Sequence, residues 1–254
     1  MADMHEQTTL AANAATTGTR LPTGLRFDVV GDLPGVFAAW QFVYQAYRRC
    51  GWIEANPFAL HAHARVINDS PAVVTGSIGP VLAATLTAVA DGEHGLPVDE
   101  LFAHETQSLR DQNRQLMQLT LLADRRRRLT RCLDSLLEMM RLSWWYAPLC
   151  GATDLLMCTA ADDAGIFGTL FGFQEISTVR PDPVLGGLSS VLLRLDIDAV
   201  TQSEPLRPTI GYFMGSPPDP TIFENKCILT REAISGSAIG QYLGMLQRDG
   251  QVPE

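Results

Sequence analysis

Lysine is nearly absent from this sequence, because all but one of its 19 basic side chains are arginine, the exception being Lys226. The 28 acidic side chains leave a net charge of −9, which argues against nucleic acid as a partner. Apolar runs of the roughly 18 residues that a membrane-spanning helix needs are also missing, so no transmembrane segment is predicted. Residues 1–24 lack the basic and apolar regions of a secretory signal and are predicted to form a flexible leader.

Cysteine pairs with the spacing of a redox or zinc motif are absent as well. The five cysteines form no CxxC motif, and their odd number argues against a disulfide framework. A reduced, cytoplasmic protein is therefore expected. His61 and His63 form an HxH pair, but the sequence offers no obvious third ligand, so no metal site is predicted.

Alternating strand and helix periodicities between residues 25 and 198 predict an α/β fold. Strands are expected at 27–31, 72–75, 81–89, 115–123, 154–159, 173–178 and 188–197. Helices are expected at 34–50, 101–110, 129–141 and 163–171. Asp162 is predicted to cap the start of the last of these helices, and Gly51 and Gly172 are placed to end two of them.

The strand at 115–123 carries polar side chains within an apolar run. By strict alternation Met117, Leu119 and Leu121 share one face. Gln118 and Thr120 then share the other face. Two polar side chains on one face fit a lined cleft or a half-solvated face equally well.

Arg125, Arg126, Arg127 and Arg128 follow this strand directly, and Arg131 lies in the first turn of the next helix. A helix N-terminus already carries a partial positive charge, so the cluster favours a negatively charged partner such as a phosphate or an acidic protein surface. The alternative is a solvated basic patch that Asp124 partly neutralises.

The order of elements is similar to the GNAT acyltransferase fold, and several short runs are similar to one of its branches. These runs are VYQAY at 43–47 with GWIEANP at 51–57, ATLT at 84–87, GLPVDELF at 95–102, LR at 109–110 with RQL at 114–116, and LFGFQEI at 170–176. Together they resemble the FeeM-type long-chain N-acyl amino acid synthases, relatives of the acyl-homoserine-lactone synthases, over about residues 27–198. The resemblance implies an α/β (α+β) fold with a mixed, mostly antiparallel twisted sheet and helices on both faces.

The resemblance also implies transfer of a fatty acyl group from acyl carrier protein to the amine of an amino acid or similar small amine. The donor would be acyl-phosphopantetheine on that carrier, or acyl-CoA, with no cofactor bound. The implied roles are carrier or phosphopantetheine binding by Arg125–Arg128 and Arg131, oxyanion binding by the backbone of Leu119–Leu121, and orientation of the amine by Gln118 and Thr120. Among the acidic residues Asp91, Asp99, Glu100 and Glu105, we expect Asp91, Asp99 and Glu105 to bind the amine.

Four positions depart from the family pattern. Gln118, Ala160, Asp163 and Phe167 stand where relatives usually carry glutamate, asparagine, histidine and tyrosine. Glutamine cannot act as a base and phenylalanine cannot donate a proton. A non-catalytic acyl-binding or carrier-docking module is therefore an alternative. A CoA-dependent acetyltransferase is another, although residues 125–133 lack the glycines of the usual GNAT pyrophosphate motif.

Residues 199–254 are predicted to form an extension to the acyltransferase domain at 25–198. The five prolines of 204–220 predict an extended loop. A helix is expected at 229–247, with Gly236, Gly240 and Gly244 spaced four residues apart. This glycine stripe favours close packing against the domain or against a second copy in a homodimer, and lining of the acyl chain is the alternative.

Overall fold

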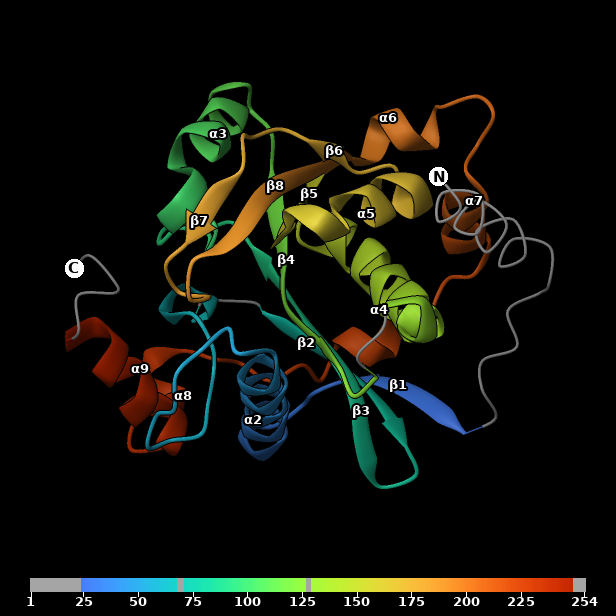
Figure 1. Cartoon of the computed structure of the whole chain (residues 1–254). Helices are drawn as coiled ribbons and strands as arrows, with labels where there is room; N and C mark the ends of the chain where they lie inside the picture. Colours follow the sequence, from blue (N-terminus) through green and yellow to red (C-terminus); the bar gives the residue numbers. More distant parts are fainter. Residues whose placement is uncertain (1–23, 68–70, 127–128, 249–254) are drawn as a thin grey trace.

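The computed structural model describes residues 24–67, 71–126 and 129–248, with the side chains of 129–131 and 247–248 left aside (Figure 1). The strands are β1 Leu25–Val29, β2 Ala72–Ile78, β3 Val81–Ala90, β4 Leu116–Asp124, β5 Asp154–Ala160, β6 Gln174–Glu175, β7 Arg180–Asp182 and β8 Leu188–Asp196. The α-helices are α2 Leu33–Cys50, α3 Asp99–Asp111, α4 Leu129–Leu149, α5 Ala164–Phe171, α6 Ile197–Thr201, α7 Pro208–Gly215, α8 Arg231–Ile234 and α9 Ala238–Arg248. Short 3₁₀ turns are η1 Ala64–Val66, η2 Ala161–Asp163 and η3 Pro220–Phe223.

All eight strands form one sheet, in the order β1-β2-β3-β4-β5-β8-β6, with β7 also paired to β8. Strands β4 and β5 run parallel, and the other pairs between described strands are antiparallel. The expectation of a mixed, mostly antiparallel GNAT-like sheet is confirmed.

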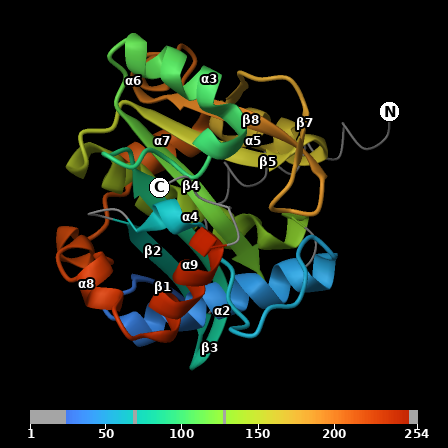
Figure 2. The same cartoon turned by 90° about the vertical axis from the view of Figure 1, so that its left-hand side faces the viewer.

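Helices cover both faces of the sheet, as expected. One apolar cluster joins α4, α5 and α7 to the sheet, and a second joins α2, α3, α8 and α9 to its other face (Figures 1 and 2). The C-terminal segment contributes to both clusters, with Phe213 and Phe223 in the first and Tyr242 and Leu243 in the second. None of the described helices is long and apolar enough to cross a membrane.

Helix α2 forms where its capping residues predict it. The Asp32 carboxylate accepts the N–H of Gly35 at 2.8 Å, and Pro34 occupies the first turn. Gly51 ends the helix with a φ of 75°, a left-handed conformation that glycine adopts without strain. The buried face of α2 includes Trp40 and Val43, three residues apart and therefore on the same side of the helix.

Strand β4 departs from strict alternation. Met117 and Leu119 face the α4 side of the sheet, but Leu121 belongs to the cluster on the α2 side. The cause is a bulge, because Thr85 pairs with Ala123 while Thr87 pairs with Thr120, which places two β4 residues opposite one on β3. Leu121 takes up the bulge with a φ of 53°. The prediction that Leu121 shares a face with Met117 and Leu119 is therefore wrong.

The C-terminal segment also differs from its prediction. The expected helix at 229–247 is split into α8 and α9 by Gly236, whose φ is 75°. A Cβ on Gly240 would lie 2.5 Å from the carbonyl oxygen of Ile234, so this glycine allows α9 to approach α8 within the chain. The predicted extended loop at 204–220 contains α7, because Pro208 starts a helix as readily as it breaks one.

Two other local predictions need correction. Asp162 lies inside η2, and α5 begins after Asp163 without a side-chain cap, while Gly172 ends α5 in the left-handed conformation as expected. The strand predicted at 173–178 is reduced to β6, and β7 was not predicted.

Candidate active site

A cavity opens in the middle of the sheet, where β4 and β5 separate. The two strands pair in parallel from Leu116 with Asp154 up to Leu119 with Met157. Beyond that point β4 continues along β3 and β5 continues along β8, so the two strands diverge. The space between them, the central cavity, encloses about 170 Å³.

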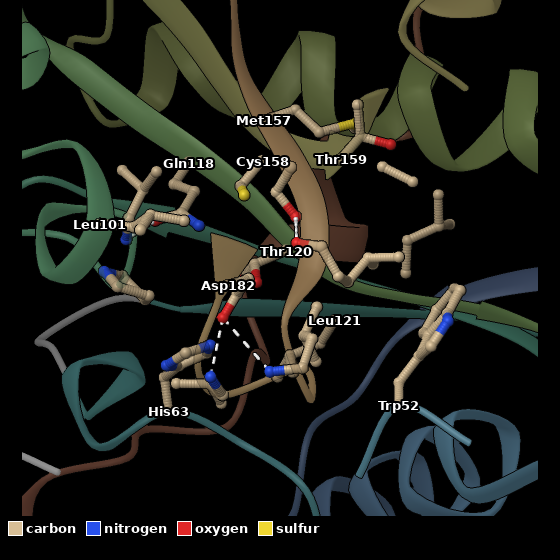
Figure 3. A pocket seen from close by; sticks show the side chains of 18 of the residues that line it. Trp52, His63, Leu101, Gln118, Thr120, Leu121, Met157, Cys158, Thr159 and Asp182 are labelled. Atoms are coloured by element: carbon tan, nitrogen blue, oxygen red, sulfur yellow. Dashed lines mark hydrogen bonds between the residues drawn. The ribbon is translucent and has the colours of Figure 1, made fainter. Parts of the chain in front are cut away.

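The walls of the central cavity come from several elements. Gln118 and Thr120 of β4 and Cys158 of β5 line it, with Asp182 and His63 on the other side (Figure 3). Asp182 is held in place because its carboxylate accepts backbone N–H groups of Val184 and Leu185 at 2.9 and 3.2 Å. Other lining residues are Tyr47, Trp52, Glu100, Leu101, Leu119, Leu121, Leu122, Ala160, Asp163 and Phe167.

The sequence-predicted residues of β4 thus lie together at the cavity. Gln118 is 3% exposed, and its Oε1 accepts the N–H of Val98 at 2.8 Å. Val98 directly precedes α3, so Gln118 fixes the start of the helix that carries Glu100. Ala160, Asp163 and Phe167, the other departures from the family pattern, also line the cavity.

Glu100 is the α3 carboxylate that lines the central cavity. Its Oε2 lies 3.9 Å from Nδ1 of His63, and its Oε1 lies 3.9 Å from Nε of Arg65. Burial, reinforced by Asp182 and Asp99 and opposed by Arg65, raises the pKa of Glu100 to about 7. A carboxylate with this pKa exchanges protons readily at neutral pH, which suits a general base.

Two neutral imidazoles, His61 and His63, line the central cavity together with Glu100. Burial lowers the pKa of His61 to about 3 and also lowers the pKa of His63. The His61 ring lies 5.0 Å from the Tyr47 ring, and its buried Nε2 has no hydrogen-bond partner among the described residues. The described part of the chain contains no group of three or more His, Cys, Asp or Glu residues that could hold a metal ion.

The three acids expected to bind the amine lie outside the cavity lining. Arg110 pairs through Nε with Oδ2 of Asp91 at 2.6 Å, and through Nη2 with Oδ2 of Asp99 at 2.8 Å. Glu105 forms an ion pair with Arg180. The structure therefore gives each of these acids an arginine partner, and it brings Glu100 from the same stretch to the cavity instead.

The described arginines between β4 and α4 differ in their surroundings. Arg125 is exposed, whereas Arg126 pairs with Asp124 at 3.0 Å and contacts the Ser135 hydroxyl. Arg127 and Arg128 lie outside the described residues, as does the side chain of Arg131.

A second cavity lies beside Arg126. This arginine-side chamber, about 260 Å³, lies between the end of α2, the end of β4 and α4, and Arg49 and Arg126 both line it. It shares Tyr47, Trp52, Leu122 and Asp163 with the central cavity. The basic residues therefore adjoin a space that borders the centre of the sheet.

No local signal in the sequence distinguishes Glu100 from its acidic neighbours. His61 and His63 form an HxH pair in the sequence, but that spacing is typical of a metal motif and does not indicate a contact with Glu100. Asp182 lies on a strand that was not predicted. These residues meet only through long-range pairing, which one sequence does not reveal.

Comparison with known proteins identifies relatives of this architecture. The family model described as N-acyl amino acid synthase FeeM matches residues 38–196. The structure of FeeM, an N-acyl amino acid synthase from uncultured soil microbes, has a TM-score of 0.60 and 18% identity, covering 71% of this chain and 95% of that chain. TofI, solved in a ternary complex with an inhibitor and MTA, has a TM-score of 0.54 and 16% identity, covering 79% of this chain and 100% of that chain.

A third solved structure, the AHL synthase LasI, has a TM-score of 0.48 and 11% identity, covering 68% of this chain and 89% of that chain. No curated protein matches the sequence. The similarity to solved structures establishes the GNAT-like fold, and the family match covers most of the sheet and the whole lining of the central cavity.

Proposed function

Since this chain belongs to the FeeM family of N-acyl amino acid synthases, we propose that it transfers a long-chain fatty acyl group from acyl carrier protein to a small primary amine. The chain is an acyltransferase, and the carrier-bound donor and the length of the acyl chain are the specific parts of the proposal. The observation that carries it is the central cavity between the diverging strands, with Glu100 and His63 on one wall and the arginine-side chamber beside it.

The arginine-side chamber supports a donor carried on phosphopantetheine. Arg49 supplies positive charge at its wall, Arg126 is paired there with Asp124, and Leu136 and Met139 supply apolar surface. A phosphate or an acidic carrier protein is attracted by the charges, and a fatty chain is accommodated by the apolar side chains. Arg125, the residue before Arg126, is exposed, and Arg49, Arg125 and Arg126 are together called the basic rim.

In the proposed reaction Glu100 takes one proton from the ammonium group of the acceptor. The amine nitrogen then attacks the thioester carbonyl carbon, which forms the C–N bond and moves negative charge to the carbonyl oxygen. Backbone N–H groups of Leu119–Leu121 are proposed to bind this oxyanion. The C–S bond breaks, and a second proton from nitrogen passes to the departing thiolate, giving the amide and free thiol.

Gln118 and Thr120 are proposed to orient the amine from β4, since both line the cavity. Cys158 also lines it, but burial and the charge of Asp182 raise the pKa of its thiol to about 12. A thiol that stays protonated at neutral pH is a poor nucleophile. Direct attack by the amine is therefore favoured over an acyl-cysteine intermediate.

The proposal is tested by incubating the protein with palmitoyl-loaded acyl carrier protein and a pool of amino acids and amines. We expect an N-palmitoyl amide by mass spectrometry and an equal amount of released carrier thiol. Product from acetyl-CoA alone would instead support the coenzyme-A-dependent alternative. Tight carrier binding without product from any amine would indicate the non-catalytic module.

A paired variant tests the basic rim. Arg49→Gln combined with Arg125→Gln should weaken carrier binding and reduce its dependence on salt, because exposed charges act through a screened field. Arg231→Gln, an exposed position on α8, is the matched control and should change neither quantity. Unchanged affinity in the double variant would contradict the assignment of the carrier to this rim.

A further inference from the structure

A third cavity, the α9-side chamber, adjoins the central cavity at a wall formed by His61, His63 and Glu100. It encloses about 360 Å³, and these three residues also line the central cavity. Tyr242, Met245 and Leu246 of α9 form another part of its lining. Helix α9 lies beyond residue 196, where the family match ends, so this wall belongs to the extension.

Helix α9 is fixed against the loop that carries the histidines. The Tyr242 hydroxyl lies 3.4 Å from the backbone nitrogen of Ala62, the residue between His61 and His63. The Tyr242 ring also packs edge-on against Phe58, with ring centroids 5.9 Å apart. The chamber is therefore a built feature of the fold, with a helix held across a loop.

The orphaned nitrogen of His61 points to a ligand. His61 is only 5% exposed, and its buried Nε2 has no hydrogen-bond partner among the described residues. Buried polar atoms normally have a partner, because an unsatisfied one costs free energy. A group bound in the α9-side chamber or the central cavity would supply that partner.

The arrangement of the three cavities indicates which substrate this group belongs to. The donor is assigned to the arginine-side chamber, which meets the central cavity at Tyr47, Trp52, Leu122 and Asp163. The α9-side chamber meets the central cavity at a different wall, where the proton acceptor Glu100 stands. The amine must present its nitrogen near Glu100, so the rest of the acceptor is directed toward this chamber.

We infer that the α9-side chamber receives the side group of the acceptor amine, and that Tyr242, Met245 and Leu246 select acceptors with an apolar side group. Ile53 and Pro57 complete the apolar part of the wall, while Glu54 and Asn56 join His61, His63 and Glu100 in its polar part. His61 Nε2 makes a hydrogen bond to the acceptor. This inference rests on the proposed function and adds to it the class of acceptor and the segment that chooses it.

The test fills the chamber and compares acceptors. Leu246→Trp should lower kcat/KM for leucine- and phenylalanine-like amines by about tenfold relative to glycine, because the indole occupies space that a larger side group needs and contacts of this size discriminate by this order. The matched control is Gln241→Trp, an exposed position on the same helix, which should leave the preference unchanged. Met245→Phe is a second, milder variant, and thermal melting verifies that each variant is folded.

The same variants are assayed with carrier-bound acyl chains of different length. A changed chain-length preference with an unchanged acceptor preference would assign the chamber to the acyl tail and overturn the inference. No change in either would overturn it as well.

A readout without turnover separates this inference from the proposed function. If the unmodified protein makes no product, leucine amide and phenylalanine amide should still raise its melting temperature more than glycine amide does, and Leu246→Trp should remove that difference. Equal shifts in both proteins would overturn the inference.

Discussion

Four carboxylates stand close together in the sequence on or just before α3, and the structure divides them into two groups. Asp91, Asp99 and Glu105 each pair with an arginine, Arg110 or Arg180. Glu100 faces the central cavity, and its approach to Arg65 is longer, at 3.9 Å. Carboxylates close in the sequence can therefore have different roles. Those that meet a close arginine form ion pairs, and Glu100, which does not, lines the cavity.

This contrast has an electrostatic basis. A guanidinium within hydrogen-bond distance compensates the charge of a carboxylate and fixes its position. Glu100 lacks such a close cation and is buried, so its pKa rises to about 7. The paired acids hold α3 in position, and that position places Glu100 at the cavity.

The difference between the two groups of acids is tested most directly by neutralising one acid from each group. Glu100→Gln should lower kcat/KM for amide formation by about 100-fold or more, because a positioned base contributes at least that factor. Glu105→Gln should change kcat/KM by less than about threefold, since its partner is Arg180 and it lies outside the cavity lining. Equal losses in the two variants would restore Glu105 as an amine-binding residue.

The pH dependence sharpens the same contrast. Glu100 must be ionised to accept a proton, so kcat/KM should rise as pH increases through about 7, the pKa that burial gives this carboxyl. A rate profile from pH 5.5 to 8 should show this inflection, and Glu100→Gln should lack it. An inflection of equal size in the variant would assign the titration to another group.

The role of the arginine-paired acids in holding α3 is tested through the free energy of unfolding. Arg110→Gln leaves Asp91 without its guanidinium and leaves Asp99 with only the longer approach of Arg65, at 3.6 Å. It should lower the free energy of unfolding by about 2 kcal/mol, since breaking a partly buried pair strands its charges. Arg48→Gln is the control, because its partner Glu54 is fully exposed and such pairs contribute about 0.5 kcal/mol or less. Urea unfolding measures both, and equal effects would contradict the division.

The smallest effect is expected at the cavity thiol. Cys158→Ser should change kcat/KM by less than about threefold, because a thiol with a pKa near 12 is not the nucleophile. Mass spectrometry of the intact protein with acyl-loaded carrier provides the second measurement. An acyl adduct on the unmodified protein that disappears in the variant would contradict direct attack.

The sequence predicted those parts of the fold that local chemistry determines. Helix α2 has its capping aspartate, proline and glycine within the helix itself or next to it. The apolar runs at 81–89, 154–159 and 188–197 match β3, β5 and β8 to within one residue. The bulge at Leu121 was not visible, because it arises from the register between β3 and β4. The break at Gly236 was missed because one glycine within a helical pattern does not by itself predict a break.

The candidate site was predictable to a similar degree. For Gln118 and Thr120 the alternation left a lined cleft and a half-solvated face open, and the resemblance implied a role for the backbone of Leu119–Leu121. In the structure all four residues line the cavity. The choice among the acidic residues depended on Arg110, which meets Asp91 from 19 positions away in the sequence. Such a pairing is a property of the folded chain, so Glu100 could be considered but not singled out.

The packing of the last stretch of the chain bears on how the protein should be produced. The family match ends at residue 196, yet Phe213 and Tyr242 beyond it belong to opposite apolar clusters. The Trp145 indole also donates to the carbonyl of Phe213 at 2.7 Å. A recombinant fragment that ends at the family boundary would expose apolar surface on both faces of the sheet. The expressed fragment should therefore include α9.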